Sequence, residues 1–297
     1  MLERPERAHL TLRGPDAHEY LQGQVTNDIQ ALAPGDGCYA ALLNPKGRIL
    51  ADMRVLAISP EELWLDLEDI AHETALRELK MYKIGRRVEI ADAGAERTVV
   101  SVIGPGAWEA LERAGIAQGP RPATEHAWVR TADQAVVAAT DTGFDLLVSP
   151  ATVAPLIRSL TDTGTAPVSA AAADIVRIER GRPRYGTDMS DENLPGEAGI
   201  VERAVSFTKG CYVGQEPVAR MFHKGHPNRH LRGLLLSAPV EPGTPVVAAG
   251  KEVGRVTSAA VSPRHGAIAL GILRREVAPG DEIAAGPATG KVAEPPL

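Results

Sequence analysis

The chain has 297 residues, of which 44% are hydrophobic and 24% charged, and its formal net charge is −6. This length allows about two domains, and this composition can bury an apolar core, which excludes a chain that is disordered throughout. The acidic balance disfavours a general nucleic-acid binder, and the wide separation of the two cysteines, Cys38 and Cys211, disfavours a zinc motif or a CxxC redox pair.

The sequence carries no signal for a membrane or for export. Its first residues, MLERPERAHL, are charged and lack the apolar core of a signal peptide. No stretch approaches the roughly 18 consecutive apolar residues that a membrane-spanning helix needs. We therefore expect a cytoplasmic protein.

Short strands alternate with single helices over the first part of the chain. Leu10 and Leu12 alternate with polar residues as in a strand, and Asp16 is a candidate N-cap for the helix that follows. Residues 44–47 predict the tight turn of a hairpin. This pattern is typical of α+β sheets with helices on one face. Further strands are expected at 38–43, 48–58, 63–67, 88–90, 98–103, 127–131, 135–140 and 144–148, and helices at 70–81, 108–114, 153–161 and 170–179.

The pattern changes after residue 180. Residues 181–199 are rich in Gly and Pro and have little periodicity, and a loop of this length is usually functional or disordered. From Leu231 onward, short strands separated by Gly/Pro turns predict a small β-barrel or sandwich as a separate C-terminal domain. The final residues, 292–297, are expected to form a loose tail.

The run KGCYVGQE, residues 209–216, has the most informative chemistry. Its two glycines leave the backbone around Cys211 free to turn sharply, and Pro217 fits the first turn of a following helix. A neighbouring Lys209 and a helix N-terminus both favour a reactive thiolate. The alternative is that Cys211 is a small buried packing residue, as free cysteines often are. Cys38, in an apolar strand, is expected to be buried and inert.

Residues 203–232 are strongly basic. They contain six Lys or Arg and one acid, Glu216, for a local charge of +5, so the rest of the chain carries −11. Such a stretch predicts an anionic partner, although a solvated, mobile hairpin explains the charge equally well. The three histidines of the run lie beside glycine and proline, which disfavour a helix carrying metal ligands, so no metal site is expected.

The run KGCYVGQEPVAR, residues 209–220, resembles the signature of the YgfZ-type folate-binding proteins, which are relatives of the glycine cleavage T protein (aminomethyltransferase). Three other segments, 12–29, 44–55 and 174–189, are also similar to that family. The resemblance covers nearly the whole chain, and the KGCYxGQE run is its most specific part.

The resemblance implies an α+β, glycine cleavage T protein-like multi-domain fold with a small C-terminal β-barrel, arranged around a channel that accepts tetrahydrofolate. The expected domains are 1–42 and 140–230 for the folate-binding α+β region, 43–139 for a middle α+β domain, and 231–297 for the barrel. It also implies a role in assembling or repairing iron–sulfur client enzymes, with an indirect effect on tRNA thiomethylation and no direct contact with nucleic acid or membrane.

The resemblance also implies roles for individual residues. Cys211 and Lys209 are expected to be the reactive pair. Glu179 is expected to accept hydrogen bonds from the pterin, unless it is an ordinary helix-end acid paired with Arg177 or Arg180. Two tyrosines could stack on a ring or could simply fill the core. The full set of expected folate-binding residues is Asp52, Tyr82, Glu179, Tyr185, Gln215, Glu216 and Arg220, with Lys224 and Arg229 as further cations for the glutamate tail.

One departure from the T protein bears on the reaction. The corresponding hairpin of the T protein ends in two consecutive aspartates, whereas this chain has Ala51 and Asp52. This predicts no glycine cleavage activity, although Asp52 alone could still contact a folate. We rank an iron–sulfur assembly or repair factor first, a folate-dependent one-carbon (aminomethyl) transferase second, and a non-catalytic binding module third.

Overall fold

The computed structural model describes residues 1–297 with the exception of the Lys224 side chain. The chain divides into two compact units, and each is built from three separate segments. Unit 1 comprises Met1–Leu43, Leu50–Ala170 and Ala204–Val213. Unit 2 comprises Asn44–Ile49, Ala171–Arg203 and Gly214–Leu297. In the part of the chain that the structure describes, no helix is long and apolar enough to cross a bilayer.

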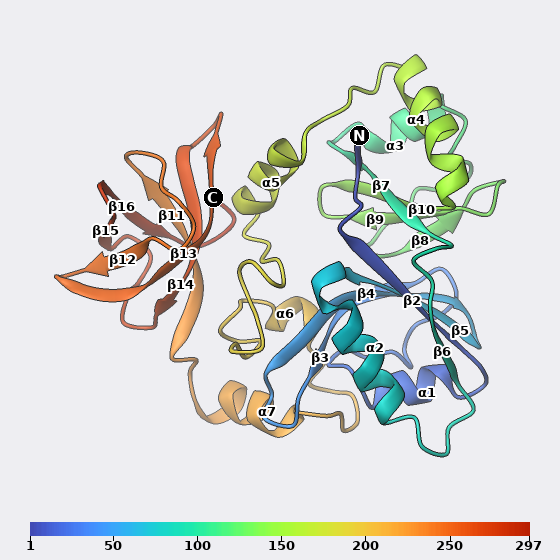
Figure 1. Ribbon diagram of the computed structural model, residues 1–297, viewed down its shortest axis with the longest axis horizontal. Coiled ribbons are helices and arrows are strands. Elements are labelled where there is room, and N and C mark those ends of the chain that lie inside the picture. The colour runs from blue at the N-terminus through green and yellow to red at the C-terminus, as the bar shows by residue number, and fades with distance from the viewer. The chain divides into compact units, whose positions relative to one another are not determined.

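Unit 1 contains two five-stranded sheets (Figure 1). One sheet has the order β3 (Gly37–Leu43), β4 (Ile49–Ser59), β5 (Glu62–Glu68), β2 (Arg7–Arg13), β6 (Glu89–Asp92). The other has the order β1 (Leu2–Glu3), β7 (Thr98–Ile103), β10 (Gly143–Val148), β9 (Val136–Thr140), β8 (Trp128–Arg130). The strands expected from the sequence are thus present, with ends that shift by a residue or two.

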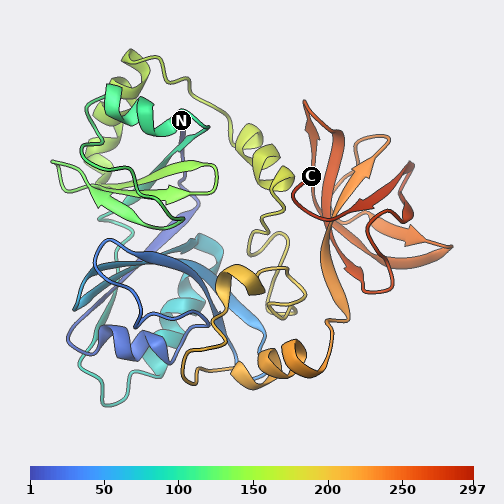
Figure 2. The ribbon, with the colours of Figure 1, turned by 180° about the vertical axis from the view of Figure 1, so that it is seen from behind.

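Helices cover these sheets on single faces. Figures 1 and 2 show α2 (His72–Met81) on one face of the first sheet, where α1 (Ala17–Gln22) also packs. On the second sheet, α3 (Ala107–Arg113) and α4 (Val153–Asp162) bury Trp108, Leu111 and Leu160 against apolar strand residues. This arrangement confirms the α+β expectation.

Strand β4 is buried along nearly its whole length, because both of its faces are covered. Leu56 and Ile58 pack against Val136 and Leu147 of the other sheet. A strand that is covered on both sides needs apolar residues at consecutive positions, which explains why residues 55–58 read as an unbroken apolar run.

Helix α1 begins where the sequence predicts, but its cap differs from the expectation. Asp16 occupies the N-cap position without making a side-chain capping bond. Its Oδ2 instead accepts a hydrogen bond from the backbone N–H of Arg87 at 2.7 Å. The carboxylate thus fastens the loop before β6 rather than the helix end.

Unit 2 contains a closed barrel of six strands, which confirms the predicted C-terminal barrel. Its order is β11 (Arg229–Leu236), β14 (Gly266–Arg274), β13 (Lys251–Ser262), β12 (Pro245–Ala248), β15 (Glu282–Ala285), β16 (Ala288–Ala293). Apolar residues such as Leu234, Val256 and Leu273 fill its interior. Three helices complete the unit: α5 (Ala170–Glu179), α6 (Val201–Ala204) and α7 (Gln215–Lys224).

The hairpin turn between β3 and β4 forms as predicted. The N–H of Gly47 donates to the carbonyl of Asn44 at 2.8 Å, and Gly47 adopts a φ of +76°, which favours glycine. The N–H of Ile49 donates to the carbonyl of Asn193 at 3.0 Å, so the turn packs within unit 2.

The prediction of a loose C-terminal tail is wrong. Residues 288–293 form β16, and the last residue packs against the unit. The N–H of Leu297 donates to the carbonyl of Glu179 at 2.7 Å, and its side chain joins Ile178, Leu231 and Ile268 in an apolar cluster. The sequence could not show this, because the surface that receives Leu297 is assembled from distant segments.

Candidate functional site

Asp52 is the most unusual carboxylate of unit 1. It lies on β4 and is buried. Its Oδ2 accepts a hydrogen bond from the hydroxyl of Tyr39, on β3, at 2.7 Å. Its Oδ1 is also buried and has no hydrogen-bond partner among the described residues. A buried acceptor without a donor is costly, so the site has the capacity to bind a donor that the chain itself does not provide.

The protonation of Asp52 is tuned toward neutral pH. Burial raises the pKa of its carboxyl to about 6, while the Tyr39 hydrogen bond and the charge of Arg7 act to lower it. The nearby Glu68 adds to the upward shift. A carboxyl with this pKa can both accept and donate a proton near neutral pH, which is what general acid–base catalysis requires.

Neighbouring charges explain why Asp52 is not held in an ion pair. Arg7 donates to Asp66 at 2.8 Å and to Glu68 at 2.8 Å, so its guanidinium is already engaged. Arg54 also bonds Asp66. Although burial acts to raise the pKa of Asp66, Arg7 and Arg54 together hold it well below its ordinary value. The pKa of Asp66, which is paired with two arginines, is thus lowered, whereas the pKa of Asp52, which has no such pair, is raised.

The same network joins the two sheets. Arg54, on β4, donates to Asp145 of β10 at 2.9 Å, and Asp145 accepts from the hydroxyl of Ser101 on β7 at 2.5 Å. These bonds fix the strands around Asp52, because a buried charge network tolerates little displacement of its members.

Lys209 is buried and anchors the signature run within unit 1. Its Nζ donates to the backbone carbonyls of Gln22, Val25 and Asn27 at 2.6, 2.7 and 2.8 Å. The ammonium also lies 5.0 Å from the centre of the Tyr212 ring. Burial lowers the pKa of Lys209 to about 8, and the charge of Asp28 opposes that shift.

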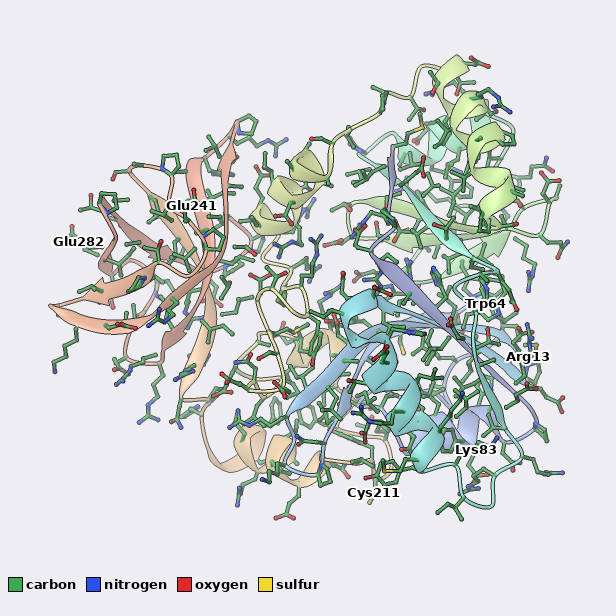
Figure 3. All side chains as sticks on the ribbon, viewed as in Figure 1. Arg13, Trp64, Lys83, Cys211, Glu241 and Glu282 are labelled. Atoms are coloured by element: carbon green, nitrogen blue, oxygen red, sulfur yellow. The ribbon has the colours of Figure 1, made fainter. Side chains whose placement is uncertain are left out.

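The loop that carries Cys211 is fastened on both sides of this residue. The N–H of Val213 donates to the carbonyl of Gly23 at 3.2 Å, and that of Ser206 to the carbonyl of Thr26 at 3.0 Å. Cys211 itself is exposed between the buried Lys209 and Tyr212, and Figure 3 shows its sulfur at the edge of the ribbon. The interpretation of Cys211 as a buried packing residue is therefore wrong.

The two members of the expected reactive pair differ in exposure, since Lys209 is buried and Cys211 is exposed. All three N–H bonds of the Lys209 ammonium are used by backbone carbonyls, so its proximity to Cys211 in sequence does not make it a direct partner of the thiol. Its charge acts on Cys38, whose pKa burial nevertheless raises to about 12. Cys38 is half-buried rather than fully buried, because it lies at the start of β3.

The expected folate-binding residues of unit 2 lie on α5, on the following loop and on α7. The Oε1 of Glu179 accepts from the hydroxyl of Ser262 at 2.5 Å. Arg177 is engaged elsewhere, with Asp174 at 2.7 Å and Asp188 at 2.5 Å. Tyr185 is half-buried and forms a backbone bridge with Met189.

Helix α7 begins at Gln215, as the sequence predicts. Its N-cap, Gly214, has a φ of +78°, a conformation that favours glycine. Gln215 and Glu216 form its first turn, and Arg220 is exposed on it. The side chain of Lys224 lies outside the described part of the chain.

Tyr82, in unit 1, does not fill the core. It is the C-cap residue of α2 and is 44% exposed. Its role toward a ring stays a prediction. Among the described residues, no group of three or more His, Cys, Asp or Glu side chains is placed to hold a metal ion.

The sequence did not single out Tyr39 or the arginine network around Asp66. The available signal was the presence of charged residues inside strands that are otherwise apolar, at Arg7, Arg54 and Asp66. A charge in such a strand must be paired when it is buried, so these positions could have been expected to meet.

Two protein-family models match the chain. The GCVT N-terminal domain matches residues 6–209, and the glycine cleavage T-protein C-terminal barrel domain matches residues 229–295. The first match alone covers more than half of the chain. The protein therefore belongs to the glycine cleavage T-protein family, and the T protein-like fold expected from the sequence is confirmed.

Individual relatives agree with this assignment. An aminomethyltransferase of Rubrobacter xylanophilus is 30% identical over 289 residues, which are 92% of this chain and 76% of that enzyme. A protein of Arabidopsis thaliana, named as a chloroplast transferase, is 27% identical over 277 residues. That match covers 91% of this chain but 64% of the plant protein, less than two thirds of its length.

A solved structure supports the fold. The glycine cleavage system aminomethyltransferase T from Bartonella henselae superimposes with a TM-score of 0.90 at 21% identity, over 99% of this chain and 85% of that one.

Proposed function

We propose that the protein is a tetrahydrofolate-dependent one-carbon transferase. In this proposal Asp52 is the general acid–base group that exchanges a proton with a nitrogen of the bound substrate. The observation that carries this proposal is the buried Oδ1 of Asp52, which lacks a partner and belongs to a carboxyl with a pKa of about 6. Membership of the glycine cleavage T-protein family and the relatives named as aminomethyltransferases support it.

The chemistry assigns separate tasks to the two oxygens of Asp52. Tyr39 holds Oδ2 and thereby fixes the orientation of the carboxyl. Oδ1 is then free to accept a proton from a nitrogen of the bound substrate or to return one. Tetrahydrofolate, when bound, supplies the nitrogen that takes up the one-carbon unit. The buried strands around Asp52 exclude water, which keeps the proton between the carboxyl and the substrate.

The test of this proposal is the Asp52→Asn variant. Asparagine preserves shape but cannot exchange a proton, so turnover should fall by about 10²–10⁴-fold while tetrahydrofolate binding stays within a few fold. Turnover is measured as methylene-tetrahydrofolate formation from amine-borne one-carbon donors. Aminomethyl-lipoyl carrier protein is included to test the prediction, made from Ala51, that the protein has no glycine cleavage activity. Undiminished turnover in this variant would contradict the role of Asp52.

A matched variant, Tyr39→Phe, sharpens the assignment. Loss of its hydrogen bond, which favours the ionised form, should raise the pKa of Asp52 above about 6. The acidic limb of the pH–rate profile should move upward with it. If the acidic limb of the profile did not move, it would report the titration of a group other than Asp52.

A second candidate function is assistance to iron–sulfur client enzymes, with Cys211 as the reactive centre. The observation that favours it is an exposed thiol on a loop fastened by Lys209 and Val213. Cys211→Ser should abolish recovery of client iron–sulfur enzyme activity while leaving tetrahydrofolate binding intact. Cys38→Ser is the control and should have no effect on either measurement.

A further inference from the structure

Unit 2 contains a cavity of about 430 Å³ between the loop 186–193 and the outer surface of the barrel. Three arginines line it: Arg229 from β11, Arg255 from β13 and Arg274 from β14. Neither Asp52 nor Glu179 is among its lining residues, although Arg229, which the sequence suggested as a cation for the glutamate tail of folate, is one of them.

The strand register places these arginines on one face. Arg229 lies directly opposite Arg274 in the β11–β14 pair. Arg255 lies opposite Ile272, two residues before Arg274 on the same strand, and residues two apart share a face. Like charges directly opposite each other destabilise a sheet unless a counter-charge lies between them. An anion bound between these side chains would reduce their mutual repulsion.

Asp188, a buried acid of the cavity lining, does not supply the counter-charge for these arginines. Asp188 accepts at Oδ1 from the hydroxyls of Thr257 and Ser258, at 2.6 and 2.7 Å. At Oδ2 it accepts from Arg177 at 2.5 Å and from the backbone N–H of Arg184 at 3.0 Å. A β-bulge between Val256 and Ser258 turns both hydroxyls toward it. Both oxygens of Asp188 are thus already bound by groups of the protein.

The other acids at the cavity leave a positive excess. Glu252 pairs with Arg255 at 3.1 Å. Arg274 lies 3.9 Å from Glu276, and both of these side chains are exposed. Arg229 forms no ion pair with any side chain that the structure describes. Glu192 is the remaining acid of the lining. Besides Asp188, the lining therefore has three arginines and two acids, which leaves one positive charge in excess, and the partner of Arg274 is an exposed acid outside the lining.

We propose that this cavity binds a small organic molecule that carries two or more carboxylate or phosphate groups. Guanidinium groups are planar, always charged and matched in geometry to both kinds of oxyanion. The volume exceeds what a single inorganic ion fills and leaves room for an organic part between the loop and the barrel. This assignment does not depend on the one-carbon reaction.

The experiment is titration calorimetry of the full chain at low salt with three probes: inorganic pyrophosphate, γ-linked triglutamate and acetate. The first two represent the phosphate and carboxylate sources, and acetate is the singly charged control. Each of Arg229→Gln and Arg274→Gln should weaken the binding of the preferred probe by about tenfold. Arg275→Gln, a neighbouring exposed arginine that does not line the cavity, should leave it unchanged.

The pattern of results decides the proposal. Binding of pyrophosphate or triglutamate that is lost in Arg229→Gln and Arg274→Gln supports it, and the tighter probe identifies the source of the oxyanion. Three results would overturn it: no binding of either probe to the unmodified protein, equal binding of acetate, or an equal loss in Arg275→Gln. Since all three positions are exposed, these substitutions should not prevent folding.

Discussion

Each of the two units buries an aspartate, and the two carboxylates are treated in opposite ways. In unit 2, Asp188 accepts four hydrogen bonds and is fully engaged. In unit 1, Asp52 accepts one from Tyr39 and keeps a buried oxygen without a described partner. A saturated carboxylate fixes structure, whereas an unsaturated one with a raised pKa is available for chemistry. This contrast associates Asp52, rather than Asp188, with a reaction.

The largest expected effect tests the structural side of this contrast. Asp188→Asn removes the buried one of the two carboxylates that pair with the half-buried Arg177, so the free energy of unfolding should fall by about 3–5 kcal/mol. Urea denaturation measures it. Asp191→Asn, at an exposed position of the same loop, is the control and should change stability by less than about 0.5 kcal/mol. Equal stability of the two variants would contradict a structural role for Asp188.

His9, another buried group of unit 1, should make the free energy of unfolding depend on pH. Both nitrogens of His9 are buried without partners among the described residues, and burial lowers the pKa of this imidazole to about 4. The unfolded chain, with an ordinary value near 6.5, binds more protons between these limits. Stability from His9 is therefore complete above pH 6.5 and is lost as the pH falls toward 4.

The His9→Leu variant should remove this dependence. The fall in the free energy of unfolding between pH 6.5 and 4 should shrink by about 3 kcal/mol, since the shift spans more than two pH units. The measurement is urea denaturation across that range. An unchanged slope would mean that His9 is already protonated in the folded protein.

The contribution of Asp52 to stability should depend on pH in the direction opposite to that of His9. Its folded pKa of about 6 exceeds the ordinary value of 3.8, so its contribution is fully present below pH 3.8 and is lost as the pH rises through 6. At pH 8, Asp52→Asn should therefore be more stable than the unmodified protein by about 3 kcal/mol. A loss of stability instead would mean that Asp52 holds the fold together, as Asp188 does.

The smallest effect on stability is expected at the exposed thiol. Cys211→Ser should change the free energy of unfolding by less than about 0.5 kcal/mol, because the side chain is exposed. In the unmodified protein, a thiol reagent should modify Cys211 much faster than Cys38, whose pKa is raised to about 12. Equal rates at the two cysteines would remove the distinction between them.

Local patterns predicted most of the fold. The helix at 170–179, the start of α7 and the barrel strands all follow from periodicity, glycine and proline, which act over a few residues. The positions of Lys209 and Leu297 could not be predicted in this way. Each is fixed by partners more than a hundred residues away along the chain, and short-range patterns carry no information about such partners.

The candidate site was predicted in part for the same reason. Asp52 was found because its hairpin resembles a known one, but its partner Tyr39 lies on a different strand of ordinary composition. Likewise, the sequence placed Lys209 beside Cys211, whereas the three carbonyls of the 22–27 segment direct its ammonium elsewhere. The direction of a long side chain depends on acceptors that only the folded chain brings together.

The Lys209 anchor also has a consequence for the order of folding. Unit 1 is incomplete until Ala204–Val213 is available, although its other segments end at Ala170. During synthesis, the carbonyls of Gln22, Val25 and Asn27 therefore remain without this donor until almost two hundred further residues have emerged. Contacts of such long sequence separation are slow to form. The final closure of unit 1 is thus a late step, and the run that carries Cys211 becomes ordered at the moment when that step occurs.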